Sequence, residues 1–228
     1  MTDSALDTIP ASFAAGNRKT LDALRLYLIT DRTLLPEGGF LAAIEAALKG
    51  GVRAIQLREK DLPENELREL AEQVRHLTRR YDALLFINHR ADLAQAVGAD
   101  GVHLTESSGP VRRIRKQFPD LLIGKSTHSL ESALRAQHQG ADFVTFSPVY
   151  DTPSKQQYGS PQGLEKLAQV CAGLEIPVLA LGGIDLSRIT PVRKSGAFGI
   201  ALIRGIWKCP NIEHESLQYM NALRGETS

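Results

Sequence analysis

The chain has 228 residues, of which 43% are hydrophobic and 23% are charged. These proportions are those of a globular protein, and they exclude a disordered or fibrous chain. The 27 Lys and Arg residues nearly balance the 26 Asp and Glu residues, which gives a net charge of +1. That balance excludes a protein whose overall charge draws it to nucleic acid or to an acidic membrane, so any anion site must be built locally.

No apolar run approaches the roughly 18 residues that a membrane-spanning helix needs. The first 17 residues include Asp3 and Asp7 and lack the long apolar core of a secretory signal. The two cysteines, Cys171 and Cys209, do not have the spacing of a zinc or redox motif. Such isolated thiols are typical of a reducing compartment, and we therefore expect a cytoplasmic protein.

Short apolar runs recur along the chain, with amphipathic stretches between them. Runs this short, apolar at consecutive positions, are typical of strands buried on both faces of a parallel sheet. Eight such runs occur, at residues 26–30, 54–58, 84–88, 101–104, 121–125, 143–147, 178–182 and 199–203.

The stretches between these runs have the periodicity of helices. Residues 64–79 place Leu67, Leu70 and Val74 on one stripe, after a proline at a position suited to a first helical turn. A glycine suited to close a helix precedes several of the strand runs, as at Gly98. Further helices are expected at residues 41–49, 129–139 and 163–171, with another opened by Pro110.

This alternation predicts a single (β/α)8 barrel, the TIM-barrel fold, over residues 25–228, preceded by a short N-terminal extension of residues 1–24. The alternative is an open, doubly wound parallel sheet. No G-x-G-x-x-G sequence follows the first strand run, which argues against the dinucleotide-binding version of that alternative.

Polar and cationic residues follow nearly every strand run, where a barrel of this kind carries its function. Several cations at these ends are expected to converge on one mouth and to bind a multiply charged anion such as phosphate or diphosphate. The Gly182–Gly183 pair after the seventh run allows the backbone to approach a phosphate closely. The converging cations are Arg58, Lys60, Lys125, Lys155 and Arg204.

Two histidines lie near these strand ends. His128 follows Ser126 and Thr127, and it is a candidate for proton transfer near neutral pH. The alternative for His128 is a hydrogen-bonding role that orders its loop. His103 lies inside a strand run, and we expect it to be a core histidine with its hydrogen bonds satisfied.

A set of motifs in a fixed order resembles the thiamine phosphate synthase family and its sister group, the thiazole tautomerases, over residues 26–207. The resemblance implies a (β/α)8 barrel that acts in thiamine biosynthesis and is commonly dimeric. The motifs are LITDR (28–32), QLREK (56–60), INHRADLA (87–94), GADGVHL (98–104), IGKSTHS (123–129), GADFVTFSPVYDTPSK (140–155) and LGGI (181–184).

The resemblance implies a transferase that couples hydroxymethylpyrimidine diphosphate to a thiazole phosphate and releases diphosphate. By resemblance, the pyrimidine diphosphate is bound by Gln56, Arg58, Lys60 and Asn88, and phosphate groups are bound by Thr152, Ser154 and Lys155. The thiazole phosphate is bound by Gly182 and Gly183 with the backbone near Ile203 and Arg204, although the family pattern has Ser where Arg204 stands. Ser126 and Thr127 complete the expected substrate-binding set, and the expected catalytic residues are His128, Lys155 and Arg58.

The metal ligands of the family are replaced in this chain. His89 and Ser108 stand where the synthase pattern has magnesium-binding aspartates, and Glu106 is the nearby carboxylate. Magnesium is expected for a synthase, yet imidazole is a poor ligand for this hard ion.

Two alternatives to the synthase remain open, and the replaced metal ligands favour the first of them. The first is a thiazole carboxylate phosphate tautomerase, an isomerase that uses His128 as acid and base and needs no cofactor. The second is a catalytically silent relative that binds thiamine phosphate. The full set of cations favours the synthase. We expect small phosphorylated substrates as partners, no nucleic acid or membrane, and a homodimer.

Overall fold

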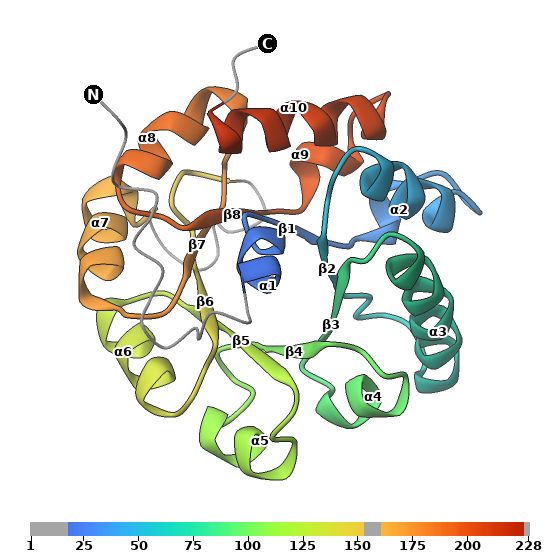
Figure 1. Cartoon of the computed structure of the whole chain (residues 1–228), viewed down its shortest axis with the longest axis horizontal. Coiled ribbons are helices and arrows are strands. Elements are labelled where there is room, and N and C mark those ends of the chain that lie inside the picture. The colour runs from blue at the N-terminus through green and yellow to red at the C-terminus, as the bar shows by residue number, and fades with distance from the viewer. Residues whose placement is uncertain (1–17, 153–160, 226–228) are drawn as a thin grey trace.

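The computed structural model describes residues 18–152 and 161–225, so two predicted site residues, Ser154 and Lys155, lie outside the described residues. Eight parallel strands form a closed barrel in the order β1 to β8, with β8 paired to β1 (Figure 1). The eight predicted strand runs are confirmed, and the open-sheet alternative is wrong. The strands are β1 (Leu26–Ile29), β2 (Ala54–Leu57), β3 (Leu84–Asn88), β4 (Gly101–Leu104), β5 (Leu122–Thr127), β6 (Phe143–Phe146), β7 (Val178–Leu181) and β8 (Gly199–Leu202).

Helices surround the barrel in a ring (Figure 1). The long predicted helices are present, and α5 begins directly after Pro110, as expected. Two short turns of 3-10 helix, η3 (Arg32–Leu34) and η5 (Leu186–Arg188), lie in the connections. The ring consists of α2 (Phe40–Lys49), α3 (Glu64–Arg80), α4 (Ala91–Ala96), α5 (Val111–Gln117), α6 (Leu130–His138), α7 (Gly163–Gly173), α8 (Ile189–Lys194), α9 (Arg204–Trp207) and α10 (Ile212–Arg224).

The barrel interior is a packed core. Tyr27, Phe86 and Phe143 meet edge to face at its centre, with ring centroids 5.3–5.4 Å apart. Glycines make room for these rings, because a Cβ on Gly101 would lie 2.5 Å from the Phe86 ring and one on Gly124 would lie 2.4 Å from the Phe143 ring. A ligand must therefore bind at one end of the barrel.

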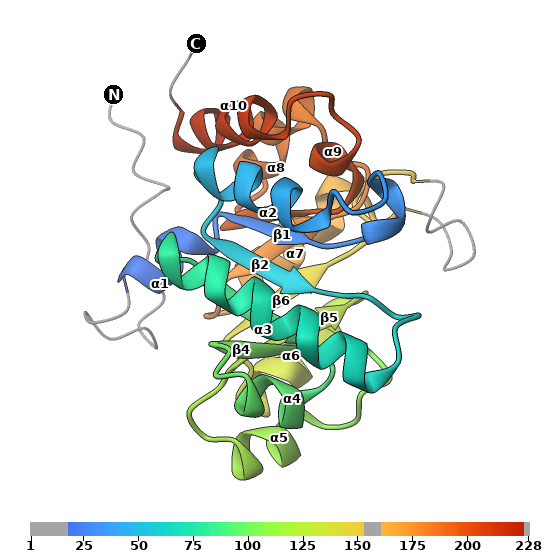
Figure 2. The same ribbon diagram turned by 90° about the vertical axis from the view of Figure 1, so that its right-hand side faces the viewer.

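One end of the barrel is covered by the described part of the N-terminal extension. Helix α1 (Arg18–Ala23) lies across the amino-terminal ends of the strands, and Ala23 and Leu24 join the same apolar cluster as Tyr27 (Figure 2). The carboxyl ends of the strands face the opposite way, and their loops form the mouth of the barrel.

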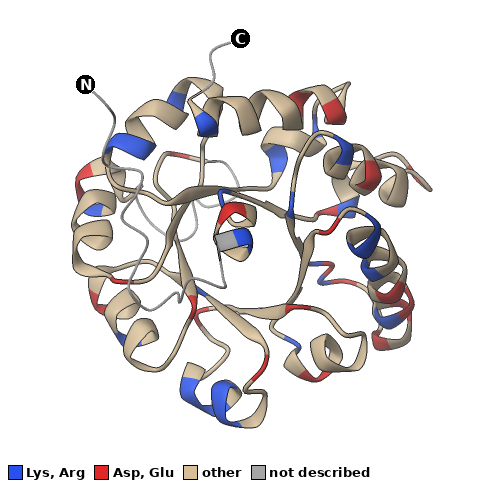
Figure 3. Ribbon diagram, in the orientation of Figure 1, with Lys and Arg blue, Asp and Glu red and all other residues tan. Residues whose placement is uncertain are grey.

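Charges of both signs lie on the surrounding helices, while the strands carry few of them (Figure 3). This distribution agrees with the near-zero net charge. Within the described ranges, no helix has the length and apolar character that a membrane crossing needs.

Candidate active site

Alternation along each strand decides which side chains reach the mouth, because successive residues point to opposite faces of the barrel wall. Tyr27, Phe86 and Phe143 mark the interior face. The register pairs Gln56 with Phe86 and Ser126 with Thr145, so Gln56 and Ser126 also face the interior. Gln56 is buried and Ser126 is half-buried.

The loop after β2 is fixed by a buried carboxylate. Glu59 accepts a hydrogen bond from the Thr30 hydroxyl at 2.5 Å and another from the backbone N–H of Arg32 at 3.1 Å. The Thr30 hydroxyl oxygen in turn accepts a hydrogen bond of 2.9 Å from the backbone N–H of Arg58. Burial is the main cause that raises the pKa of Glu59. These bonds hold Arg58 and Lys60, which flank Glu59 in sequence, at the mouth.

The loops after β2 and β3 share a cationic corner, formed by Arg58, Lys60 and His89. The charge of Arg58 is the largest cause that lowers the pKa of Lys60, followed by burial. Burial lowers the pKa of His89, and the charges of Arg90, Lys60 and Arg58 lower it further. The lowered pKa leaves His89 neutral near pH 7, so Arg58 and Lys60 are the cations of this corner. A bound anion is favoured here because its charge relieves the repulsion between these two side chains.

Two neighbours of the cationic corner have partners within the protein. Asn88 Nδ2 lies 2.9 Å from His89 Nδ1. Arg90 contacts Glu64 at 2.8 Å and Asp92 at 2.9 Å, and these carboxylates raise its pKa. Arg90 is thus compensated locally, whereas no side-chain carboxylate within the described part of the chain forms an ion pair with Arg58 or Lys60.

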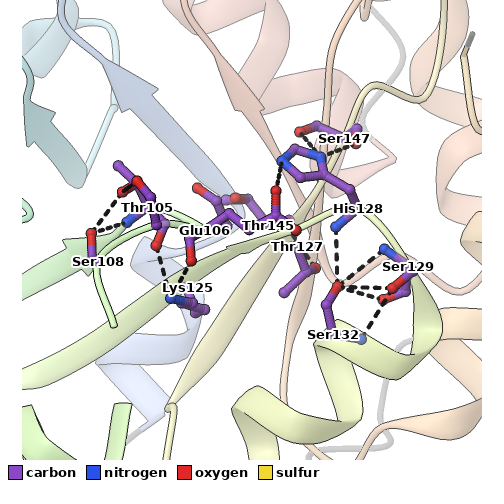
Figure 4. A network of polar contacts seen from close by, with 12 residues as sticks. Thr105, Glu106, Ser108, Lys125, Thr127, His128, Ser129, Ser132, Thr145 and Ser147 are labelled. Atoms are coloured by element: carbon purple, nitrogen blue, oxygen red, sulfur yellow. Dashed lines mark hydrogen bonds and ion pairs between the residues drawn. The ribbon is translucent and has the colours of Figure 1, made fainter. Parts of the chain in front are cut away.

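Both ring nitrogens of His128, at the end of β5, have polar neighbours (Figure 4). Its Nδ1 lies 2.6 Å from the backbone carbonyl oxygen of Ser147, which only accepts, so Nδ1 carries a hydrogen. Its Nε2 faces the Glu106 carboxylate at 3.6 Å. The geometry suits either proton transfer at Nε2 or the ordering of the loop after β4.

Lys125 does not join the cations of the mouth. It lies on the outer face of β5, and its ammonium contacts the backbone carbonyl oxygens of Thr105, Glu106 and Gly109 at 2.8, 3.3 and 3.2 Å (Figure 4). Burial lowers its pKa. Lys125 also lines a cavity of about 250 Å³ that includes residues of α5 and α6. The prediction that Lys125 converges on the anion site is therefore wrong, and Lys125 instead ties down the β4–α5 loop.

Thr127 is also placed away from the mouth. Its side chain is fully buried on the outer face of β5, and its hydroxyl donates to the backbone carbonyl of Thr145 at 3.1 Å. Ser126 and His128, one position to either side, take the inward direction. The expected side-chain contact between Thr127 and substrate is corrected accordingly.

The glycine pair after β7 lies beside the β6–α7 segment. Gly182 and Gly183 have φ values of +104° and +65°. A Cβ on Gly183 would lie 2.6 Å from the Asp151 carbonyl oxygen and 2.8 Å from the Tyr150 Cβ. Close packing of two loops therefore requires glycine here, in addition to any role toward phosphate. Thr152 follows directly at the end of the described segment.

We expect Gly183→Ala to lower the free energy of unfolding by roughly 2–4 kcal/mol, because the left-handed φ and the overpacked Cβ both cost energy. Urea denaturation measures this loss. Gly38→Ala is the matched control, since Gly38 has a φ of +73° and nothing within 4 Å of an added Cβ. Equal losses in the two variants would show that packing against Asp151 contributes nothing.

The remaining predicted phosphate contacts lie at the end of β8. Ile203 is half-buried, and Arg204 is exposed at the first residue of α9. The indole N–H of Trp207 donates to the carbonyl of Ile29 at 2.7 Å, which anchors α9 to the end of β1. In barrels of this class, the loops after strands seven and eight and a short extra helix often form the phosphate site.

The residues present do not fit a magnesium ion held by protein side chains. Within residues 18–152 and 161–225, no group of three or more His, Cys, Asp or Glu side chains is arranged to hold a metal. The Ser108 hydroxyl lies 2.6 Å from the Thr105 hydroxyl, and Glu106 faces His128. A single carboxylate is a poor match for an ion that prefers octahedral oxygen ligands.

One feature of the site was missed from the sequence. Tyr27 belongs to an entirely apolar-looking strand run, yet its hydroxyl lies between Gln56 and His103 inside the barrel. His103 is fully buried with its nitrogens engaged, as expected of a core histidine. The alternation along β1 could have placed Tyr27 inside, but its partners come from distant strands.

A (β/α)8 barrel with a cationic corner and glycine turns at the carboxyl end of its strands is an enzyme scaffold for phosphorylated small molecules. The family model described as thiamine monophosphate synthase matches residues 26–206. The chain belongs to this family and is an enzyme of its transferase type.

Individual relatives agree with this assignment. The chain is 50% identical over 187 residues to a putative thiamine-phosphate synthase of Geobacter sulfurreducens, covering 82% of this chain and 88% of the relative. It is 42% identical over 183 residues to the thiamine-phosphate synthase of Pyrococcus furiosus, and the match covers 80% of this chain and 86% of the relative. A solved thiamine phosphate pyrophosphorylase from Pyrococcus furiosus superposes with a TM-score of 0.84 at 36% identity, covering 92% of this chain and all of that one.

Proposed function

We propose that the protein joins hydroxymethylpyrimidine diphosphate to a thiazole phosphate and releases diphosphate. The observation that carries this proposal is the uncompensated pair Arg58 and Lys60, held at the mouth by the buried Glu59. Family membership supplies the reaction, and the cationic corner supplies the chemistry that the reaction needs.

The reaction begins with cleavage of the C–O bond between the pyrimidine methylene and the diphosphate. The bonding electrons leave with the diphosphate oxygen, where Arg58 and Lys60 meet the developing negative charge. The thiazole nitrogen then donates its lone pair to the methylene carbon and forms the new C–N bond. By resemblance, Lys155 adds a third cation, and Gly182 and Gly183, with the backbone near Ile203 and Arg204, hold the thiazole phosphate.

Magnesium is proposed to enter with the diphosphate as part of the substrate. Arg58 and Lys60 offset the charge that remains, and no protein carboxylate other than Glu106 is needed near the ion. This proposal is tested by the magnesium titration described in the Discussion.

The tautomerase alternative is supported by the geometry of His128, whose Nε2 faces the mouth beside Glu106. A single assay separates the candidates. We expect diphosphate release to require both synthase substrates, and we expect thiazole carboxylate phosphate to show no proton exchange above background. Exchange without diphosphate release would select the tautomerase, and tight binding without turnover of either substrate set would select the silent relative.

A cytoplasmic homodimer is proposed on the resemblance alone. Light scattering on the purified protein should give about twice the chain mass of 24.9 kDa. A mass equal to one chain at micromolar concentration would contradict the dimer.

A further inference from the structure

The glycine turn after β7 is tied to its surroundings through its carbonyl groups. The backbone N–H of Tyr150, in the segment after β6, donates to the carbonyl oxygen of Gly182 at 3.1 Å. The next carbonyl along the chain, that of Gly183, accepts a hydrogen bond from the guanidinium of Arg188. Two successive carbonyl groups of the turn therefore have partners within the protein.

The side chain of Arg188 joins the two loops. Arg188 is the last residue of η5 and directly precedes α8. Its guanidinium lies over the Tyr150 ring, 4.5 Å from the ring centroid, and its Nε lies 3.6 Å from the Asp185 carboxylate. A guanidinium over an aromatic face is attracted to it, so the stack and the hydrogen bond hold Arg188 in one place. We call Arg188, Tyr150 and the Gly183 carbonyl the loop clamp.

The direction of the two carbonyl groups fixes the direction of two N–H groups. Both peptide units are trans, and in a planar trans unit the C=O bond and the following N–H bond point in opposite directions. The carbonyls of Gly182 and Gly183 face Tyr150 and Arg188. The N–H groups of Gly183 and Ile184 therefore point away from these partners. Among the described residues, neither N–H group donates to a protein acceptor.

Two adjacent N–H groups without protein acceptors, in a turn of positive φ, form a concave backbone site of the kind that binds phosphate. Gly183 has no side chain to restrict its φ and ψ, so a partner must hold the following peptide in one orientation. The loop clamp supplies that partner on the carbonyl side.

We propose that Arg188 is a positioning residue, which acts through the Gly183 carbonyl to keep the Gly183 and Ile184 N–H groups directed at the phosphate of the thiazole substrate. The inference rests on the proposed function, which places that phosphate at this turn. Arg188 thus contributes to phosphate binding through the backbone and not by contact of its own charge with the ligand.

The test separates recognition of the phosphate from recognition of the rest of the ligand. Calorimetry with thiazole phosphate and with its unphosphorylated alcohol gives the ratio of the two affinities. In Arg188→Met this ratio should fall about tenfold, because the hydrogen bond that orients the turn is lost. The affinity for the alcohol should stay unchanged. A general structural loss would instead weaken both ligands together.

Further variants distinguish the loop clamp from the charge of Arg188. Arg188→Lys keeps the charge but lacks the planar group that stacks and donates at once, so the ratio should remain about threefold below wild type. Tyr150→Leu removes the ring and should lower the ratio by a similar factor. Arg193→Met is the matched control, because Arg193 is a half-buried arginine in the last turn of α8. It should keep the wild-type ratio.

A second measurement keeps the loop clamp separate from the proposed function. In isotope-labelled wild-type protein, inorganic phosphate should shift the amide NMR signals of Gly183 and Ile184, and Arg188→Met should reduce these shifts. The same response in a wild-type protein that forms no thiamine phosphate would support the loop clamp and contradict the proposed function.

Three results would overturn the positioning role of Arg188. The first is an unchanged ratio in Arg188→Met, or in Tyr150→Leu should Arg188→Met fail to fold. The second is full recovery of the ratio in Arg188→Lys, which would mean that charge alone acts. The third is a wild-type protein in which the Gly183 and Ile184 signals respond neither to inorganic phosphate nor to thiazole phosphate.

Discussion

Arg58→Met is expected to lower kcat/KM for the pyrimidine diphosphate by about 10²–10³, the usual effect of removing a group placed where charge develops. Arg58 acts on both neighbours in the cationic corner, since its charge lowers the pKa of Lys60 and contributes to the lowered pKa of His89. Steady-state kinetics with saturating thiazole phosphate measure the loss. Methionine keeps much of the side-chain length while removing the charge.

The control for this prediction is Arg53→Met, which removes a charge of the same sign at the opposite end of β2. Arg53 donates to the backbone carbonyls of Leu48 and Val52 and lies away from the mouth. We expect its kcat/KM to stay within about twofold of wild type. A similar loss in both variants would mean that overall charge or stability, and not the position of Arg58, governs the rate.

His89→Asp is expected to lower the magnesium concentration for half-maximal turnover by about tenfold, because it adds one hard oxygen ligand beside Asn88. The backbone accepts the change, since His89 has a φ of +47° and Asp is among the residues that adopt this conformation most readily. Wild-type turnover should be slow and should need high magnesium. The double variant His89→Asp with Ser108→Asp should lower the magnesium concentration for half-maximal turnover further than His89→Asp alone.

The measurement is the initial rate of diphosphate release across a magnesium titration. His89→Asn is the matched control, because Asn tolerates the same backbone conformation and brings no charge. We expect it to leave the magnesium requirement nearly unchanged. Fast wild-type turnover at low magnesium, indifferent to His89→Asp, would contradict the view that the replaced ligands set the metal behaviour.

The eight strands could be predicted because each is a short apolar run buried on both faces of the barrel wall. Barrel closure followed from their number and spacing. The last helix, α10, has no counterpart among the predictions. It buries Tyr219, Met220 and Leu223 on one side, but a sequence rich in polar residues obscures this stripe.

A residue at the end of a strand was correctly predicted to face the mouth only where the alternation along that strand also points its side chain to the inner face of the barrel. Lys125 and Thr127 flank Ser126 directly, and this one-residue difference turns both side chains toward the helices. The glycine at 183 was predicted to serve a ligand, whereas its nearest neighbours are backbone and side-chain atoms of residues 150–151. Such contacts join loops that are distant in the chain, and no local pattern reports them.

The most direct test of the account is a crystal structure of the protein with thiazole phosphate and a pyrimidine diphosphonate that cannot lose its leaving group. We predict that the phosphonate oxygens contact Arg58 and Lys60, with the pyrimidine ring against Gln56. Phosphonate groups bound elsewhere, with Arg58 and Lys60 still facing solvent, would contradict the assignment of the cationic corner as the diphosphate site.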